Sequence, residues 1–358
     1  MPPLDLSASS IDLTRTICDI PSVSGDETPL ADAIFAAVSA LDHLEVIRHG
    51  DTIVARTRLG RDQRVAIAGH IDTVPINANL PTRDEEIDGA PYLWGRGTVD
   101  MKAGVAVQLK LAAELVSPRV DITWMWYDHE EVAAELNGLT RLAASRPDLF
   151  EADFAILGEP SNGTVEGGCN GNLRAIVRTA GVRSHSARSW IGENAIHKAA
   201  PILSRLAEYR AREVSVDGLV YREGLNAVRI SGGIAGNVIP DACEVEVNYR
   251  FAPNKDGAAA EAHVRDVLAG FDVEIIDLAE GARPGLDAPL AQEFVAAVGG
   301  EPKPKYGWTD VARFSAMGVP AVNYGPGDPH LAHHDDERVP LAQIEDVERG
   351  LRAWLTGA

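Results

Sequence analysis

Apolar runs of strand length alternate with helical segments along the first 160 residues. Residues 64–72, 120–128 and 152–160 each begin with an apolar run and end in polar or acidic residues, a pattern typical of buried parallel strands. Residues 101–116 repeat their apolar positions at helical spacing, and a second helix is expected over 132–144. Strands alternating with helices predict an α/β sheet with helices on both faces, whose ligands bind beyond the carboxyl ends of the strands.

The pattern changes in the middle of the chain. Strands with alternating apolar and polar positions are expected at 173–180, 227–234 and 243–251. Residues 194–211 have the pattern of an amphipathic helix. We therefore expect a smaller α+β domain over 173–284. It would be inserted into an α/β/α domain that has a mixed, mainly parallel sheet and is formed by residues 1–172 and 285–358.

Charge and composition narrow the class of protein. The 358 residues include 33 basic and 53 acidic side chains, a formal net charge of −20, which repels nucleic acid and anionic membranes. The chain has neither an apolar stretch of membrane-spanning length nor an N-terminal segment like a signal peptide, so a cytoplasmic protein is expected. The three cysteines form no CxxC pair, which argues against a zinc ribbon or a disulfide framework.

Candidate chemistry lies at the ends of the expected strands. His70 and Asp72 are two positions apart, so their side chains project to the same side of a strand. A neutral imidazole is a common metal ligand and a nearby carboxylate can fix its tautomer, but a surface histidine beside a solvated acid fits equally. Asp100 could be a ligand or the N-cap of the helix that follows it. Asp100 also stands where a dinucleotide-binding loop, begun here by Gly95 and Gly97, needs its third glycine. Its negative charge would repel a pyrophosphate, so nucleotide binding is disfavoured.

Three further sites carry the same residue types. Glu130 and Glu131 follow the strand expected at 120–128, and Glu159 lies in a Gly-Glu-Pro turn after the next strand. Each could instead be a solvated loop acid. Late in the chain, the segment AHHDDE contains His333, with His330 and His334 as competing ligand candidates, or is simply a polar turn.

Together these sites indicate a metal centre. Clustered carboxylates repel one another unless cations compensate them, and no lysine or arginine cluster accompanies these motifs. His, Asp and Glu without Cys suit zinc or a similar divalent ion. Two divalent cations would balance three carboxylate ligands and one hydroxide.

The motifs resemble those of the M20 family of two-zinc amidohydrolases and peptidases. GHIDTVP, GRGTVDMKAG, DHEEV, LGEPS and AHHDDE occur in the family's order and span nearly the whole chain. The resemblance implies that one zinc is held by His70 and Glu159, the other by Glu131 and His333, and both by Asp100, with Glu130 as general base and Asp72 orienting His70. Ala103, where the family usually has glycine, is a small departure.

The resemblance also implies a mechanism and an assembly. Two zinc ions, for which cobalt can substitute, share a hydroxide that attacks an amide carbonyl while Glu130 moves the proton. The segment GVRSHSARSW is similar to the family's dimerisation segment, although Ser184 replaces the usual alanine. It implies a homodimer joined through the inserted domain, which would also act as a lid, with His185 stabilising the oxyanion in the partner subunit's site. His197, on the expected amphipathic helix, is interpreted as structural.

Within the family, the chain is most similar to actinobacterial enzymes that cleave N-succinyl-LL-2,6-diaminopimelate to succinate and LL-2,6-diaminopimelate in lysine and diaminopimelate biosynthesis. Such an anionic substrate needs local cations, and the resemblance implies Arg250 as the carboxylate-binding residue. Further candidate substrate contacts are Arg188, Asn237 and Thr309, the last also a candidate helix N-cap. The metal motifs fit an acetylornithine deacetylase, an aminoacylase or a metallo-carboxypeptidase equally. A non-enzymatic scaffold is disfavoured because no ligand or base is missing.

Overall fold

The computed structural model describes residues 4–357. They divide into two compact units. Unit 1 contains the chain up to Gly167, Pro284–Lys303 and the chain from Thr309, and unit 2 contains Gly168–Arg283 and Pro304–Trp308. No helix within residues 4–357 combines the length and the apolar character needed to cross a lipid bilayer.

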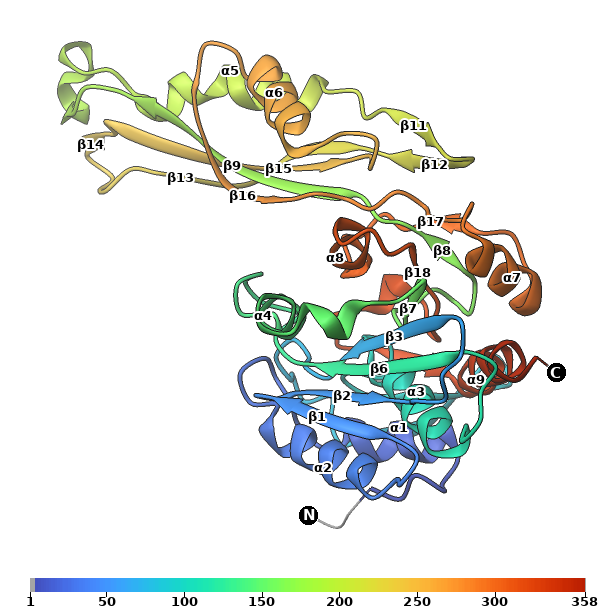
Figure 1. The fold of residues 1–358 in the computed structure, drawn as a ribbon. Helices are drawn as coiled ribbons and strands as arrows, with labels where there is room; N and C mark the ends of the chain where they lie inside the picture. Colours follow the sequence, from blue (N-terminus) through green and yellow to red (C-terminus); the bar gives the residue numbers. More distant parts are fainter. Residues whose placement is uncertain (1–3, 358) are drawn as a thin grey trace. The chain divides into compact units, whose positions relative to one another are not determined.

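Unit 1 is organised around a mixed sheet (Figure 1). Its strands follow the order β1 (Glu45–His49), β2 (Thr52–Arg56), β6 (Asp121–Tyr127), β3 (Arg64–His70), β7 (Phe154–Leu157), β18 (Ala321–Asn323), β8 (Glu166–Gly167) and β17 (Lys303–Pro304). The pairs β3–β6, β3–β7 and β7–β18 are parallel, whereas β1–β2, β2–β6 and β8–β18 are antiparallel. The four parallel strands at the centre therefore end at one edge of the sheet.

Helices cover both faces of this sheet (Figure 1). They are α1 (Ser10–Cys18), α2 (Thr28–Ser39), α3 (Lys102–Glu114), α4 (Gly138–Ser145), α7 (Pro289–Val298), α8 (Val311–Ala316) and α9 (Leu341–Thr356). Helix α3 is buried along most of its length because it packs against α1, α9 and β3. A separate three-stranded sheet contains β4 (Arg83–Ile87), β5 (Ala90–Trp94) and β19 (Arg338–Pro340).

One predicted helix is wrong in its first half. The helix expected over 132–144 begins only at Gly138, and residues 132–136 form an exposed turn. The side chain of Asn137 accepts hydrogen bonds from the backbone N–H groups of Leu139 and Thr140, so it caps α4. The chain uses the residues before this cap to turn away from the end of β6.

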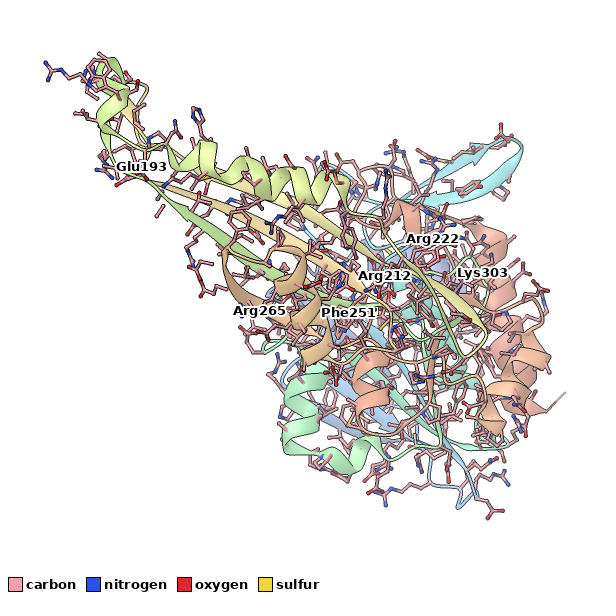
Figure 2. All side chains as sticks on the ribbon, turned by 90° about the horizontal axis from the view of Figure 1, so that it is seen from above. Glu193, Arg212, Arg222, Phe251, Arg265 and Lys303 are labelled. Carbon is pink, nitrogen blue, oxygen red and sulfur yellow. The ribbon has the colours of Figure 1, made fainter. Side chains whose placement is uncertain are left out.

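Unit 2 is a four-stranded antiparallel sheet with two helices packed against it. The strand order is β13 (Gly224–Gly232), β15 (Ala242–Phe251), β9 (Gly171–Ala180) and β16 (Asp272–Ala279), and the helices are α5 (Ala195–Glu208) and α6 (Gly257–Val267). In Figure 2, α5 runs along the unit between Glu193 and Arg212. Smaller elements are the hairpin of β11 (Glu213–Val216) and β12 (Leu219–Arg222), the pair β10 (Ser184–His185) and β14 (Val238–Ile239), and the 3₁₀ helix η2 (Ser186–Ile191).

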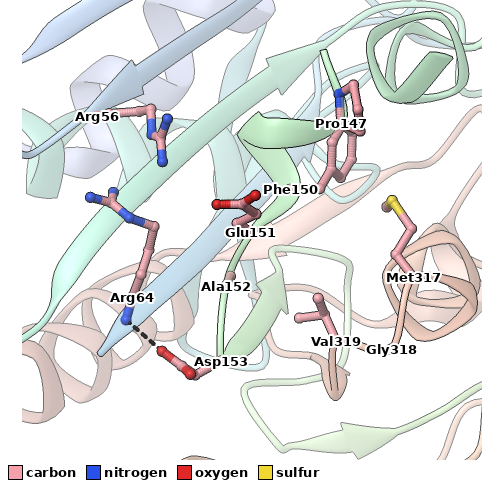
Figure 3. A pocket seen from close by; sticks show the side chains of 10 residues that line it. All are labelled: Arg56, Arg64, Pro147, Phe150, Glu151, Ala152, Asp153, Met317, Gly318 and Val319. Carbon is pink, nitrogen blue, oxygen red and sulfur yellow. Dashed lines mark hydrogen bonds between the residues drawn. The ribbon is translucent and has the colours of Figure 1, made fainter. Parts of the chain in front are cut away.

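A cavity of about 720 Å³ lies at the amino-terminal ends of the parallel strands (Figure 3). Arg64 begins β3 and donates its backbone N–H to Asp153 Oδ2 at 2.8 Å. Arg56, Glu151 and Met317 also line the cavity, so acids and bases are both present. None of the candidate residues lines it, because those residues follow the opposite, carboxyl ends of the strands.

Candidate metal centre

Three neighbouring parallel strands carry candidate residues at their carboxyl ends. His70 is the last residue of β3, Glu130 and Glu131 follow β6, and Glu159 follows β7. The strands β6, β3 and β7 are adjacent in the sheet. The edge where such strands end is the usual place for a ligand in an α/β fold.

Four of the candidate side chains contact one another. His70 Nε2 lies 3.0 Å from Asp100 Oδ1, and His333 Nε2 lies 3.3 Å from Asp100 Oδ2. His333 Nε2 also lies 2.9 Å from Glu131 Oε1. Ligand atoms of His70, Asp100 and Glu131 all lie within 4.8 Å of one another. Asp100 therefore presents one oxygen to each histidine.

One side of the cluster is buried and the other side is exposed to solvent. His70 is 1% exposed, whereas the side chain of His333 is 53% exposed. Glu159, which is not one of the four side chains above, is 5% exposed. The competing histidines lie elsewhere: His330 contacts Asp328 with a side chain that is 90% exposed, and His334 makes no contact with the cluster. Among residues 4–357, His333 is the histidine of this segment that joins the cluster.

The start of helix α3 brings Asp100 into place. The N-cap of α3 is Met101 and no side chain caps the helix, so Asp100 is not its N-cap. On the first turn of α3, a Cβ on Gly104 would lie 2.2 Å from the backbone oxygen of Gly158. Only glycine allows this approach, which joins the helix directly to the turn that carries Glu159.

Asp72 contacts His70 through both its backbone oxygen and its carboxylate, and its predicted role in orienting His70 stays a prediction. His70 Nδ1 lies 3.0 Å from the backbone oxygen of Asp72 and 3.4 Å from its carboxylate. The fully buried carboxylate also accepts hydrogen bonds from the backbone N–H groups of Glu130 at 3.0 Å and Glu131 at 3.1 Å, and from the Ser24 hydroxyl at 2.6 Å. The backbone carbonyl thus favours the tautomer with a free Nε2, and the carboxylate fixes the turn after β6.

The contacts shift the pKa values of the two histidines upward. Burial lowers the pKa of His70, but hydrogen bonds and attraction from Asp100 and Asp72 outweigh this effect and raise it well above its ordinary value. Hydrogen bonds to Asp100 and Glu131 raise the pKa of His333 to about 10. The same histidines hold the pKa of Asp100 below its ordinary value despite burial.

The neighbouring glutamates shift in the opposite direction from Asp100. Burial raises the pKa of Glu130 well above its ordinary value, and repulsion from Asp310, Glu159 and Glu131 adds to the rise. Burial is also the main cause of the raised pKa of Glu131. The site therefore holds more buried acid than its protein cations neutralise.

A second cluster, not anticipated from the sequence, lies beside the first. Ligand atoms of Glu27, Asp128 and His129 lie within 4.8 Å of one another. Asp128 already pairs with Arg141 Nη2 at 2.5 Å, and Glu27 Oε1 accepts the backbone N–H of His129 at 3.1 Å. His129 adopts a φ of 59°, in the left-handed region. Because the residues of this second cluster are already bound to other protein groups, we interpret the cluster as a support for the turn before Glu130.

Four of the other predicted residues belong to unit 2. His185 is exposed on β10, where its Nδ1 accepts the N–H of Ala187 at 3.0 Å. Arg188 is exposed in η2, and Asn237 is exposed with its backbone oxygen accepting the N–H of Ser186 at 2.9 Å. Arg250 is half-buried on β15, and burial lowers the pKa of its guanidinium.

Thr309 belongs to unit 1 and is not a helix N-cap. Its hydroxyl donates to Asn323 Oδ1 at 2.9 Å, and the N-cap of α8 is Asp310. Thr309 is 5% exposed. The catalytic role of His185 and the substrate-binding roles of Arg188, Asn237, Arg250 and Thr309 stay predictions.

The sequence matches known proteins along nearly its whole length. The model of peptidase family M20/M25/M40 matches residues 66–356. A Mycobacterium tuberculosis protein with the provisional name succinyl-diaminopimelate desuccinylase DapE is 53% identical, over 99% of this chain and 100% of its own. The succinyl-diaminopimelate desuccinylase of Corynebacterium glutamicum is 49% identical, over 99% of this chain and 98% of its own.

Solved structures share the fold. A tripeptidase of Staphylococcus aureus superposes with a TM-score of 0.77 at 21% identity, covering 99% of this chain and 98% of that one. A dinuclear metal-binding M20 peptidase of Bacillus subtilis has a TM-score of 0.68 at 17% identity, with coverages of 97% and 96%. The predicted fold class and the predicted family resemblance are both confirmed.

Proposed function

Because this chain belongs to peptidase family M20/M25/M40, we propose that it is a metal-dependent amide hydrolase that cleaves N-succinyl-LL-2,6-diaminopimelate to succinate and LL-2,6-diaminopimelate. The observation that carries the proposal is the convergence of His70, Asp100, Glu131 and His333 beside Glu130. The choice of substrate rests on full-length relatives of 53% and 49% identity that are named for this activity.

The residues of the cluster fit a pair of divalent ions. Imidazole and carboxylate groups without thiolate are the donors that zinc accepts in hydrolytic sites. The excess of buried acid, visible in the raised pKa values of Glu130 and Glu131, is what added cations would neutralise. The proposed ligands are His70 and Glu159 for one ion, Glu131 and His333 for the other, and Asp100 for both, with zinc as the metal and cobalt as a substitute. Bound ions of this kind acidify water and polarise a carbonyl oxygen.

The acid–base work falls to Glu130. Burial raises its pKa, so this carboxylate can hold a proton in mid-reaction. It takes the proton from the attacking water while the water oxygen bonds to the amide carbon. It then gives that proton to the leaving nitrogen as the C–N bond breaks, which yields succinate and the free amine. The Asp72 carboxylate keeps Glu130 in position by accepting a hydrogen bond from the backbone N–H of Glu130.

Unit 2, together with Thr309 of unit 1, supplies the groups proposed to recognise the substrate. The substrate carries three carboxylates and one ammonium group, and an arginine can bind a carboxylate through two parallel hydrogen bonds. We assign this role first to Arg250, with Arg188, Asn237 and Thr309 as further contacts. His185 is the proposed donor to the oxyanion that forms in the transition state.

A second copy of the chain is the proposed partner of unit 2. Strand β13 is an edge strand whose residues after Leu225 are exposed. Val228 is 57% exposed and Ile230 is 48% exposed on this edge. Unpaired apolar edges attract another strand. Ultracentrifugation should give twice the chain mass for the wild type and a monomer for Ile230→Lys, and a monomeric wild type would contradict the dimer.

Kinetics on a substrate panel test the activity. We expect kcat/KM for N-succinyl-LL-2,6-diaminopimelate to exceed that for N-acetylornithine and for dipeptides. Chelation should abolish turnover and added zinc should restore it. A preference for N-acetylornithine or for a peptide would move the chain to the deacetylases or carboxypeptidases of the family, and full activity without metal would refute the mechanism.

A further inference from the structure

Two loops that are distant in sequence carry Asp100 and His333, and a buried ion pair joins them. Arg96 Nη1 lies 2.7 Å from Glu337 Oε2. The side chain of Arg96 is 3% exposed and that of Glu337 is 0% exposed. Both side chains bind backbone groups of the ligand-bearing loops rather than the imidazole or carboxylate atoms of the cluster, so the pair is not itself part of that cluster.

Glu337 holds the backbone that carries Asp100. Its Oε1 accepts hydrogen bonds from the backbone N–H groups of Val99 at 2.9 Å and Asp100 at 3.0 Å. Its backbone oxygen accepts the N–H of Gly95 at 2.9 Å. One residue of the later loop thus fixes both ends of the segment that leads to Asp100.

Arg96 holds the backbone that carries His333. Its Nη1 donates to the backbone oxygen of His334 at 3.3 Å, and its Nη2 donates to that of His333 at 3.4 Å. His333 adopts a φ of 67°, a left-handed conformation that side-chain-bearing residues seldom take. Such a conformation persists only where neighbouring groups hold it, and the guanidinium is one of them.

We propose that Arg96 and Glu337 are positioning residues that set the separation of Asp100 from His333. They thereby set the affinity of the site for the metal ion that Glu131 and His333 are proposed to hold. The inference rests on the proposed function for the identity of the ion. The two side chains cross-link the loops reciprocally: the acid of the later loop binds amides of the earlier one, and the base of the earlier loop binds carbonyls of the later one. Partners of metal ligands commonly change affinity by about 10–100-fold when they are replaced.

The competing explanation is that the pair only stabilises the fold. Unit 2 contains a matched case: Glu223, with a side chain 0% exposed, pairs with Arg212 at 3.1 Å and with Lys255, and accepts the N–H of Ala252 at 3.1 Å. Glu223→Gln therefore removes a buried acid of the same kind from a unit that contains none of the proposed metal ligands. It is the control for Glu337→Gln.

The experiment compares zinc affinity and amide exchange. In Glu337→Gln the remaining side-chain oxygen can still accept from the backbone N–H groups of Val99 and Asp100. The new NH₂ group faces the Arg96 guanidinium, so the ion pair is lost. We expect zinc affinity, measured by competition with a chelator, to fall about 10–100-fold, and amide hydrogen exchange in the metal-free protein to quicken at 95–101 and 332–337. Glu223→Gln should leave both readouts at wild-type values, even where it lowers the melting temperature as much.

Arg96→Lys provides a second variant in case Glu337→Gln does not fold. Lysine keeps the charge opposite Glu337 but cannot also reach the two carbonyls. Exchange should quicken at 332–337 and not at 95–101, with a smaller loss of zinc affinity. Wild-type affinity and exchange in either folded variant, or an equal effect of Glu223→Gln, would overturn the proposal. A wild type that binds no zinc would instead refute the proposed function, while the exchange data would still test the cross-link.

Discussion

Replacing Asp72 by asparagine separates its contact with His70 from its support of the turn after β6. The carboxylate accepts the N–H groups of Glu130 and Glu131 and the hydroxyl of Ser24, whereas His70 is held at the shorter distance by a backbone oxygen. An asparagine keeps one acceptor oxygen and places an NH₂ group where the second was. Ser24 can turn to accept from it, but one backbone N–H loses its partner, which costs about 1–3 kcal/mol.

We therefore expect Asp72→Asn to lower the free energy of unfolding by about 1–3 kcal/mol and kcat by about 10–100-fold, with zinc still bound through His70. Chemical denaturation of the metal-free protein, zinc content and steady-state kinetics measure the three quantities. Ser24→Ala is the control because it removes one hydrogen bond and leaves both amides satisfied. If Asp72→Asn lost zinc but kept its stability, the carboxylate would act on His70 and the reasoning would be refuted.

Three further outcomes follow from the structure. Glu130→Gln should lower kcat at least about 100-fold with zinc content unchanged, and a loss of less than about tenfold would exclude Glu130 as the base. Gly104→Ala forces a Cβ to within 2.2 Å of the Gly158 oxygen, so a thermal shift should show about 1–3 kcal/mol of destabilisation together with weaker zinc binding; wild-type values of both would contradict the contact. Burial raises the pKa of the Cys18 thiol from 9.0 to about 12, so it should resist thiol reagents until the chain unfolds. Rapid labelling of Cys18 in the folded protein would contradict its burial. Since the thiol ionises at lower pH in the unfolded chain, the contribution of Cys18 to stability should be complete below pH 9 and be lost as the pH rises toward 12.

The arrangement of strands could be predicted because its cause is local. The buried strands β3, β6 and β7 are rich in apolar residues, and the structure has them within a few residues of the expected bounds. The first half of the helix expected over 132–144 is wrong because its apolar residues Val132 and Leu136 are exposed in a turn, and the helix begins only after its N-cap Asn137. Periodicity does not distinguish a turn with scattered apolar residues from the first turns of a helix.

The supports of the site could not be predicted in the same way. The sequence directed attention to acids and histidines at strand ends, and the structure brings four of them into contact. Glu27, Arg96 and Glu337 stayed unnoticed because their partners are backbone groups of remote loops. Glu337 lies in the same AHHDDE segment as His333, yet residue type and spacing do not say which acid of a segment turns inward.

The donors that reach each carboxylate distinguish the roles of the acids in this site. Asp72 and Glu337 are fully buried, and each accepts two backbone N–H groups, so peptide dipoles already compensate them. Asp100 and Glu131 face imidazoles instead, and these are groups that can exchange a proton for a metal ion. A glutamine in place of Glu131 should therefore weaken zinc binding directly, without faster exchange of any amide that Glu337 holds. A glutamine in place of Glu337 should do both, and this difference separates a ligand from a residue that positions one.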